Sequence, residues 1–140
     1  MNPALLLDTH VWLWLALGIP RKLRPQTIKR IEQAATESTL GVSIVSVWEI
    51  GLLEAAQRLR LPMTAEEWVA HALKRFDLRL IGLDQPRIVL DSCRLPGGFH
   101  ADPADRVLVA TARAENAVLV TRDKKILDYG RAGHVRVLAA

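Results

Sequence analysis

Four acidic residues occupy positions where α/β proteins commonly carry their chemistry. Asp8 and Asp123 each follow a short apolar run that we interpret as a buried strand. Because ligands of open α/β sheets bind outside the carboxyl ends of the strands, both acids are expected at that edge. Glu49 and Asp105 are expected on inward-facing sides of helices, since apolar residues flank them at helical spacing. The pattern therefore predicts four carboxylates that converge at one end of a sheet.

Such a cluster points to a bound divalent cation. Like charges held together repel, and each carboxyl group tends to protonate unless a cation is present. An unpaired carboxylate on an apolar helix face, as expected for Glu49, also needs a partner, a proton or a metal. Ligand sets made only of oxygen suit Mg²⁺ or Mn²⁺ rather than zinc. A metal held in this way can generate hydroxide from water and neutralise the leaving oxygen of a phosphodiester. The predicted metal ligands, which would also be catalytic, are Asp8, Glu49, Asp105 and Asp123.

Each acid also has an ordinary structural explanation. Asp8 and Asp123 could simply cap the helices that follow them, and Asp105 could interact only with a helix dipole. His100 could touch a substrate, although a role at the helix entry is the simpler interpretation. Polar residues beside the acids could support the site or merely cap helices. This supporting group is Thr9, Ser46, Asp102 and Thr121.

Short apolar runs and helical patterns alternate along the chain, which is typical of an α/β protein with a mainly parallel sheet. The 140 residues are expected to form one domain, residues 1–140. The first apolar run should be the central strand, buried on both faces, and the last should be an edge strand. Strands are predicted at 5–7, 40–44, 79–83, 118–120 and 135–138. Helices are predicted at 10–17, 25–36, 84–95, 103–115 and 125–129, with two more that end near residue 58 and begin near residue 64.

Two helices carry apolar patterns with consequences for the site. Trp12 and Trp14 are two positions apart on one short helix, so they point to different sides. Either packing on both sides buries both, or at least one lies in a protein interface, where Trp is enriched.

The helix of Glu49 is predicted to bury a stripe with Glu49 in its middle. That stripe is Val45, Trp48, Leu52, Leu53 and Ala56.

Composition excludes several classes of protein. Lys and Arg outnumber Asp and Glu by 19 to 15, and this modest net charge of +4 suits an anionic partner. Cys93 is the only cysteine, so an intrachain disulfide and a cysteine-based zinc site are impossible, and a reducing cytoplasm fits. The N-terminus lacks the basic start of a signal peptide, and the apolar stretch at 11–17 is too short to cross a membrane. Gly97-Gly98 lacks the pattern of a phosphate-binding loop.

Three blocks of sequence resemble a known family. LLLDTHVWLW at 5–14, SIVSVWEIGLL at 43–53 and HADPADRVLVATARAENAVLVTRD at 100–123 resemble the PIN-domain ribonucleases, and more narrowly the VapC-type toxins of bacterial toxin–antitoxin pairs. The four acids fall on the positions of that family's acidic metal site. The resemblance implies a PIN-like fold, a parallel sheet flanked by helices on both faces. It also implies Mg²⁺- or Mn²⁺-dependent cleavage of RNA, homodimerisation, and inhibition by a small VapB-like antitoxin.

Two other functions stay open at this point. One is a catalytically idle PIN-like module that only binds RNA or protein, which the intact set of acids disfavours. The other is a receiver-type phosphoacceptor domain, which would need adjacent acids after the first strand, where Asp8 stands alone. Basic residues near the acids could hold the RNA backbone or could simply be a solvated surface. These residues are Arg106, Arg122, Lys124 and Lys125.

Overall fold

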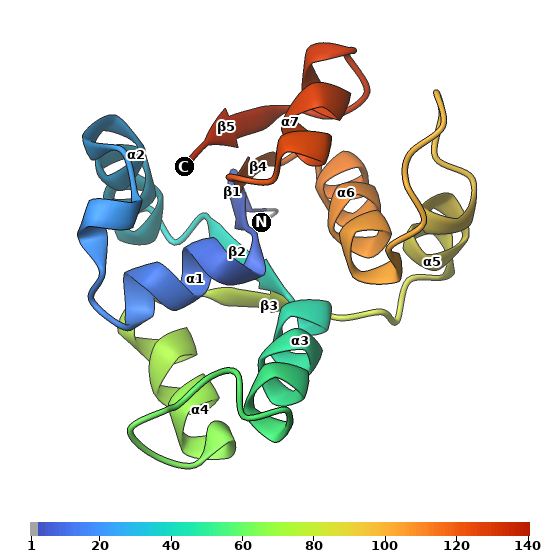
Figure 1. Ribbon diagram of the computed structural model, residues 1–140. Coiled ribbons are helices and arrows are strands. Elements are labelled where there is room, and N and C mark those ends of the chain that lie inside the picture. The colour runs from blue at the N-terminus through green and yellow to red at the C-terminus, as the bar shows by residue number, and fades with distance from the viewer. Residues whose placement is uncertain (1–2) are drawn as a thin grey trace.

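All five strands are parallel, in the order β3-β2-β1-β4-β5 (Figure 1). The computed structural model describes residues 3–140. The prediction of a parallel sheet is confirmed, with the first strand at its centre and the last at an edge. The strands are β1 (Leu5–Leu7), β2 (Leu40–Ser43), β3 (Arg79–Ile81), β4 (Val118–Thr121) and β5 (Val137–Ala139).

Helices cover both faces of this sheet, as parallel strands require for their crossover connections. They are α1 (Thr9–Ala16), α2 (Pro25–Thr36), α3 (Ile44–Ala55), α4 (Ala65–Arg75), α5 (Pro86–Cys93), α6 (Pro103–Glu115) and α7 (Lys124–Arg131), with a short 3₁₀ turn at Pro20–Lys22. Within the described residues, no helix is both long and apolar enough to cross a bilayer.

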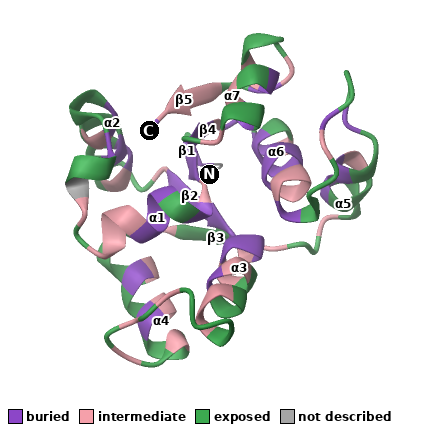
Figure 2. Ribbon diagram, viewed as in Figure 1, coloured by how far each residue is buried: buried purple, intermediate pink, exposed green. Residues whose placement is uncertain are grey.

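Alternating side chains of β1 divide the core in two. Leu6 points to the layer formed by α5, α6 and α7, whereas Leu5 and Leu7 point to the layer of α1, α2 and α4. Helix α3 contributes Val45 to the first layer and Ile50 to the second, so it closes one end of both. The buried residues accordingly run through the middle of the molecule (Figure 2). This anchoring fixes the carboxyl end of β1, where Asp8 stands.

Helix α6 has clear start and stop signals. Asp102 caps its first turn and Pro103 occupies the first helical position, both as predicted. Asn116 ends the helix in the left-handed conformation, with φ of 52°. Leu108 and Val109 are fully buried on its inner side. The helix thus holds Asp105 in its first turn at a fixed place beside the sheet.

Helix α3 corrects the predicted apolar stripe. Trp48 and Leu52 are 55% and 50% exposed, while the buried residues of the helix are Val45, Ser46 and Ile50. The helix is apolar nearly all round, so its sequence does not mark one face, and contacts with α1 and α6 select the buried side.

Element boundaries differ from the predicted ones at a few ends. The second strand stops at Ser43, whose hydroxyl caps α3, and the third strand stops at Ile81. Helix α5 begins at Pro86 rather than at Asp84, since proline suits a first helical position. None of these shifts moves a predicted site residue to another element.

Candidate active site

Asp8 joins the two central strands at their carboxyl ends. Its Oδ1 accepts a hydrogen bond of 2.7 Å from the Thr9 backbone N–H, which caps α1. Its Oδ2 accepts a hydrogen bond of 2.7 Å from the Thr121 hydroxyl, at the end of β4. The capping role weighed for Asp8 is therefore real, and it leaves lone pairs on both oxygens for another ligand.

Glu49 is oriented from α3 by a hydroxyl of α1. The Thr9 Oγ1 lies 2.5 Å from Glu49 Oε1 and 2.8 Å from Ser46 Oγ. A hydroxyl has one proton, so when Thr9 donates to the carboxylate, Ser46 donates to Thr9. Thr9 and Ser46 are both buried. This chain of hydroxyls contacts the Glu49 carboxylate, and the role of Thr9 and Ser46 in supporting a metal site stays a prediction.

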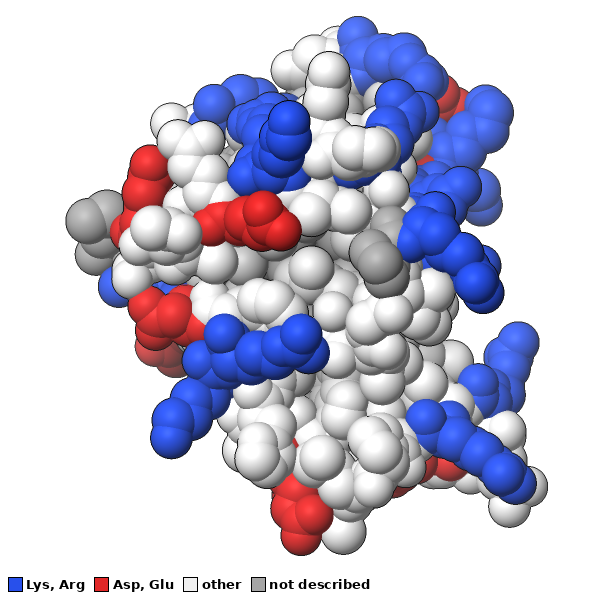
Figure 3. All heavy atoms as spheres, turned by 90° about the vertical axis from the view of Figure 1, so that its left-hand side faces the viewer, with Lys and Arg blue, Asp and Glu red and all other residues white. Residues whose placement is uncertain are grey.

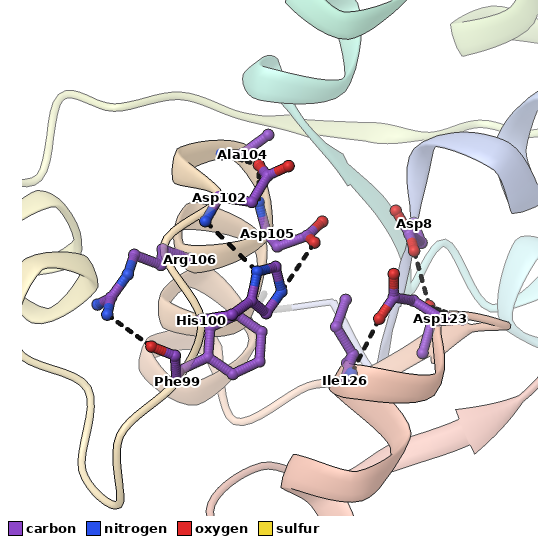
Figure 4. A network of polar contacts seen from close by, with 10 residues as sticks. Asp8, Phe99, His100, Asp102, Ala104, Asp105, Arg106, Asp123 and Ile126 are labelled. Carbon is purple, nitrogen blue, oxygen red and sulfur yellow. Dashed lines mark hydrogen bonds and ion pairs between the residues drawn. The ribbon is translucent and has the colours of Figure 1, made fainter.

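Asp123 and Asp105 approach from two helix starts on the other side of β1. Asp123 caps α7 by accepting from the Ile126 N–H at 3.1 Å, and its own N–H donates to Thr121 Oγ1 at 3.0 Å. Asp105 lies in the first turn of α6, where its N–H donates to Asp102 Oδ1 at 3.3 Å. Figure 4 shows the carboxylates of Asp8, Asp105 and Asp123 facing a common space.

Burial and mutual repulsion raise the pKa values of three of these acids. Desolvation is the main cause for Asp8, where hydrogen bonds from Thr121 and Thr9 oppose the rise in pKa. Desolvation also raises the pKa of Glu49 against the hydrogen bond from Thr9. The pKa of Asp105 rises to about 7, through desolvation first and then through the charges of Asp102, Asp8, Asp123 and Glu49. The carboxylates are thus close enough to oppose one another's ionisation.

The donor atoms of the site match those of a divalent-cation site. His100, Asp105 and Asp123 each offer one ligand atom, and these atoms lie within 4.8 Å of one another. Of the four predicted metal ligands, Asp8 and Glu49 do not belong to this group. Two ligands at about 2.1 Å from one ion can be at most about 4.2 Å apart, so small side-chain rotations would suffice. The raised pKa of Asp105 is the electrostatic sign that a positive charge would relieve. Asp8 is linked to this group through Thr121, which touches both Asp8 and Asp123.

The four predicted RNA contacts have different surroundings. Arg106 donates to the carbonyls of Ser92 and Phe99, both at 2.8 Å, so its guanidinium holds the segment between α5 and α6. Lys124 pairs with Asp128 at 2.9 Å on the surface of α7. Lys125 is exposed, and Arg122 is exposed directly beside Asp123. Arg106 thus anchors this segment, and its contact with RNA stays a prediction.

Arg122 belongs to a cationic group that sequence reasoning missed. Its guanidinium donates to the Lys22 carbonyl at 3.0 Å and lies 5.5 Å from the centre of the Trp14 ring. Lys22 Nζ lies 5.7 Å from the same ring. A hollow beside them is lined by Arg21, Lys22, Arg24 and Arg122 with Leu23, Leu127 and the C-terminal alanines. No spacing signal connects Lys22 with Arg122, because 100 residues separate them.

The chain is similar to known proteins over most of its length. The PIN domain family model matches residues 5–132. Ribonuclease VapC22 of Mycobacterium tuberculosis is 30% identical over 124 residues, which cover 89% of this chain and 90% of that protein.

Solved structures share the fold. The crystal structure of VapBC2 from Rickettsia felis bound to a DNA fragment from their promoter contains a matching chain with a TM-score of 0.70 and 18% identity. That match covers 99% of this chain and 98% of the other. DNA-bound VapBC from Salmonella typhimurium matches with a TM-score of 0.66 and 15% identity over 98% of both chains.

Proposed function

The chain belongs to the PIN domain family, and from this premise we propose that it is a metal-dependent endoribonuclease that acts as the toxin of a toxin–antitoxin pair. The observation that carries the proposal is the group of acidic side chains at the carboxyl edge of the sheet, where Asp8, Asp105 and Asp123 face a common space and the charges of Asp8, Asp123 and Glu49 raise the pKa of Asp105. The raised pKa values of Asp8, Glu49 and Asp105 indicate that the site is built for a positive charge. The ribonuclease name of the relative supports RNA as the substrate.

Asp8, Glu49, Asp105 and Asp123 would hold the metal, Mg²⁺ or Mn²⁺. When bound, such an ion lowers the pKa of a coordinated water and offsets negative charge on a phosphodiester. The protein's own contribution is orientation. Thr121 fixes Asp8 relative to Asp123, and Thr9 fixes Glu49. Asp102 holds the first turn of α6, and hence Asp105, in place.

The RNA backbone would run past the cationic side chains next to Asp123. Arg122, which donates to the Lys22 carbonyl, lies close in sequence to the exposed Lys124 and Lys125. Phosphate contacts from such side chains dominate affinity for nucleic acids. Trp14 offers an aromatic face under two of these cations. Replacing Lys124 and Lys125 together with Gln should reduce the salt dependence of RNA binding. An unchanged dependence on salt would remove these two lysines from the RNA path.

A small antitoxin is the proposed protein partner. The face that carries α2 shows an uncharged band between Lys and Arg side chains (Figure 3). A hollow of about 420 Å³ on this part of the molecule is lined by Trp14, Leu15, Leu23, Ile28 and Phe76, among others. Trp12 is fully buried whereas Trp14 is half-buried, which fits the prediction that one of the two lies at an interface. The matching chains come from crystal structures of VapBC proteins, which supports this partner. Trp14→Ala should weaken the complex or a homodimer while secondary structure stays intact.

Cleavage of RNA with and without divalent ions tests the proposal directly. The purified chain should cut RNA internally with Mg²⁺ or Mn²⁺ and lose this activity with a chelator. Asp8→Asn is the matched control, since it removes a charge with almost no change of volume. An idle binding module would bind RNA without cutting it, and a phosphoacceptor domain would instead bind beryllofluoride. Either result would refute the nuclease assignment.

A further inference from the structure

His100 is held rigidly at the edge of the acidic site. It precedes α6, and its ring stacks on Phe99 with ring centres 4.3 Å apart. Phe99 is fixed in turn, because its ring packs on Tyr129 and its carbonyl accepts from Arg106. Figure 4 shows the imidazole on the side of the segment that faces Asp105 and Asp123. A side chain held by the Phe99 ring and by the Asp102 N–H is suited to present one nitrogen in one direction.

The backbone determines which nitrogen carries the proton. The Asp102 N–H donates to His100 Nδ1 at 3.4 Å, so Nδ1 acts as an acceptor and has no proton. In the neutral ring the proton then resides on Nε2. The acidic site therefore receives an N–H donor amid carboxylates, which act only as acceptors when ionised.

The Nε2–H of His100 points into the acidic site but makes no hydrogen bond there. Nε2 lies 3.1 Å from Asp105 Oδ2, yet the two do not align as a hydrogen bond. The atom is buried from solvent, and residues 3–140 supply it with no other partner. A buried donor that has a carboxylate nearby but no aligned hydrogen bond is incompletely satisfied, so a ligand oxygen arriving there in line with the N–H would be bound favourably.

Metal coordination by His100 is the obvious alternative, because a ring nitrogen of His100 and carboxylate oxygens of Asp105 and Asp123 lie within 4.8 Å of one another. Coordination through Nε2 requires that nitrogen to be free of its proton, which would then move to Nδ1. Ligating histidines donate that second N–H to a carboxylate, a carbonyl or water. Here Nδ1 faces the Asp102 N–H instead. If Nδ1 carried the proton, its N–H and the Asp102 N–H would be two donors pointing at each other.

We propose that His100 is a catalytic residue that donates a hydrogen bond from Nε2 to an oxygen of the scissile phosphate, and that it is not a metal ligand. The inference rests on the proposed nuclease function. It adds a hydrogen-bond donor for the substrate to the carboxylates that would hold the metal. A phosphate oxygen that gains charge during the reaction would be stabilised by an N–H already aimed at it. The carboxylates would bind the metal ion, and His100 would bind the phosphate of the substrate.

The tautomer can be measured without any activity. In protein labelled with ¹⁵N-histidine, two-bond proton–nitrogen correlations show which ring nitrogen carries the proton. We expect His100 to carry it on Nε2, both without divalent ions and with saturating Mg²⁺. A proton on Nδ1, or a Mg²⁺-induced loss of the Nε2 proton, would overturn the proposal in favour of metal coordination.

Three variants test the donor role. His100→Leu removes the N–H and should lower the cleavage rate by about 100-fold, in line with the loss of one preorganised donor. His100→Gln keeps an N–H near the same position and should recover activity to within about 10-fold of the parent protein. His71→Gln removes an exposed imidazole on α4 and should cleave at the parental rate. Thermal melts of all three show whether the fold is retained.

Mn²⁺ affinity, measured by the electron paramagnetic resonance signal of the free ion, separates the explanations. The donor role predicts nearly unchanged Mn²⁺ affinity in His100→Leu, whereas loss of a ligand would weaken it by about 10-fold or more. Weakened Mn²⁺ binding, or a His100→Gln protein as slow as His100→Leu, would overturn the proposal. If the parent protein neither binds Mn²⁺ nor cuts RNA, the nuclease function itself is wrong and the donor role falls with it.

Discussion

The strand-end acids and the helix acids of this site are held in different ways. Asp8 and Asp123 follow β1 and β4, and each carboxylate also caps the next helix. Glu49 and Asp105 lie within helices and cap nothing, and the pKa of Asp105 rises to about 7. The strand-end pair thus contributes to the fold as well as to the charge of the site. The helix pair contributes charge without capping a helix, and the contacts of Thr9 with Glu49 and of His100 with Asp105 leave both pKa values raised.

The largest expected effect is on catalysis, and here the two pairs should behave alike. Replacing Asp8, Glu49 or Asp105 by its amide should reduce metal-dependent RNA cleavage by at least about 100-fold, because each change removes a charge from the ion's surroundings. Cleavage rates and Mn²⁺ titrations of the purified variants measure this. Asp123→Asn should be the mildest of the four, since Asp123 directly follows the exposed, basic Arg122 in the loop before α7. A Glu49→Gln protein that cuts RNA at the parental rate would remove α3 from the site.

Stability without metal should separate the two pairs. Asp123→Ala removes the N-cap of α7 and should lower the free energy of unfolding by about 1 kcal/mol. Asp105→Asn removes a repelled, partly buried charge and should raise the melting temperature at pH 8. Chemical unfolding in a chelating buffer measures both variants. Equal losses of stability in both would show that Asp105 has a structural partner, and the distinction between the pairs would fail.

Three of the four acids could be placed from local sequence patterns. A short apolar run followed by an acid marks both Asp8 and Asp123, and the strong start signals of α6 place Asp105 to the residue. These are local patterns, and the local structure they predict is present. The parallel sheet follows from the same alternation of runs and helices.

Features that depend on tertiary contacts were not predictable in this way. Trp48 and Leu52 looked like core residues, but α3 is apolar on several sides and its neighbours select which side is buried. The contact between Thr9 and Glu49 joins residues 40 positions apart. The tautomer of His100 depends on the direction of a backbone N–H, which no side-chain pattern encodes.

The smallest expected effect is a pH dependence of stability, and it comes from the three acids with raised pKa values, Asp8, Glu49 and Asp105. The carboxyl group of Asp105 has a pKa of about 7 in the folded protein, against an ordinary value of 3.8. Below about pH 4 the group is protonated in both states and adds nothing. Above about pH 7 it is ionised in both, and the folded state bears the full cost of the buried, repelled charge. The free energy of unfolding of the metal-free protein should therefore fall as pH rises from 4 to 7, and the raised pKa values of Glu49 and Asp8 act in the same direction.

Urea titrations across this range should show a shallower slope for Asp105→Asn, while Asp123→Ala should keep the parental slope at lower overall stability. Saturating Mg²⁺ should oppose the fall, because the ion favours the ionised carboxylates. A parental slope in Asp105→Asn would mean that the strain in the site lies with the strand-end acids instead.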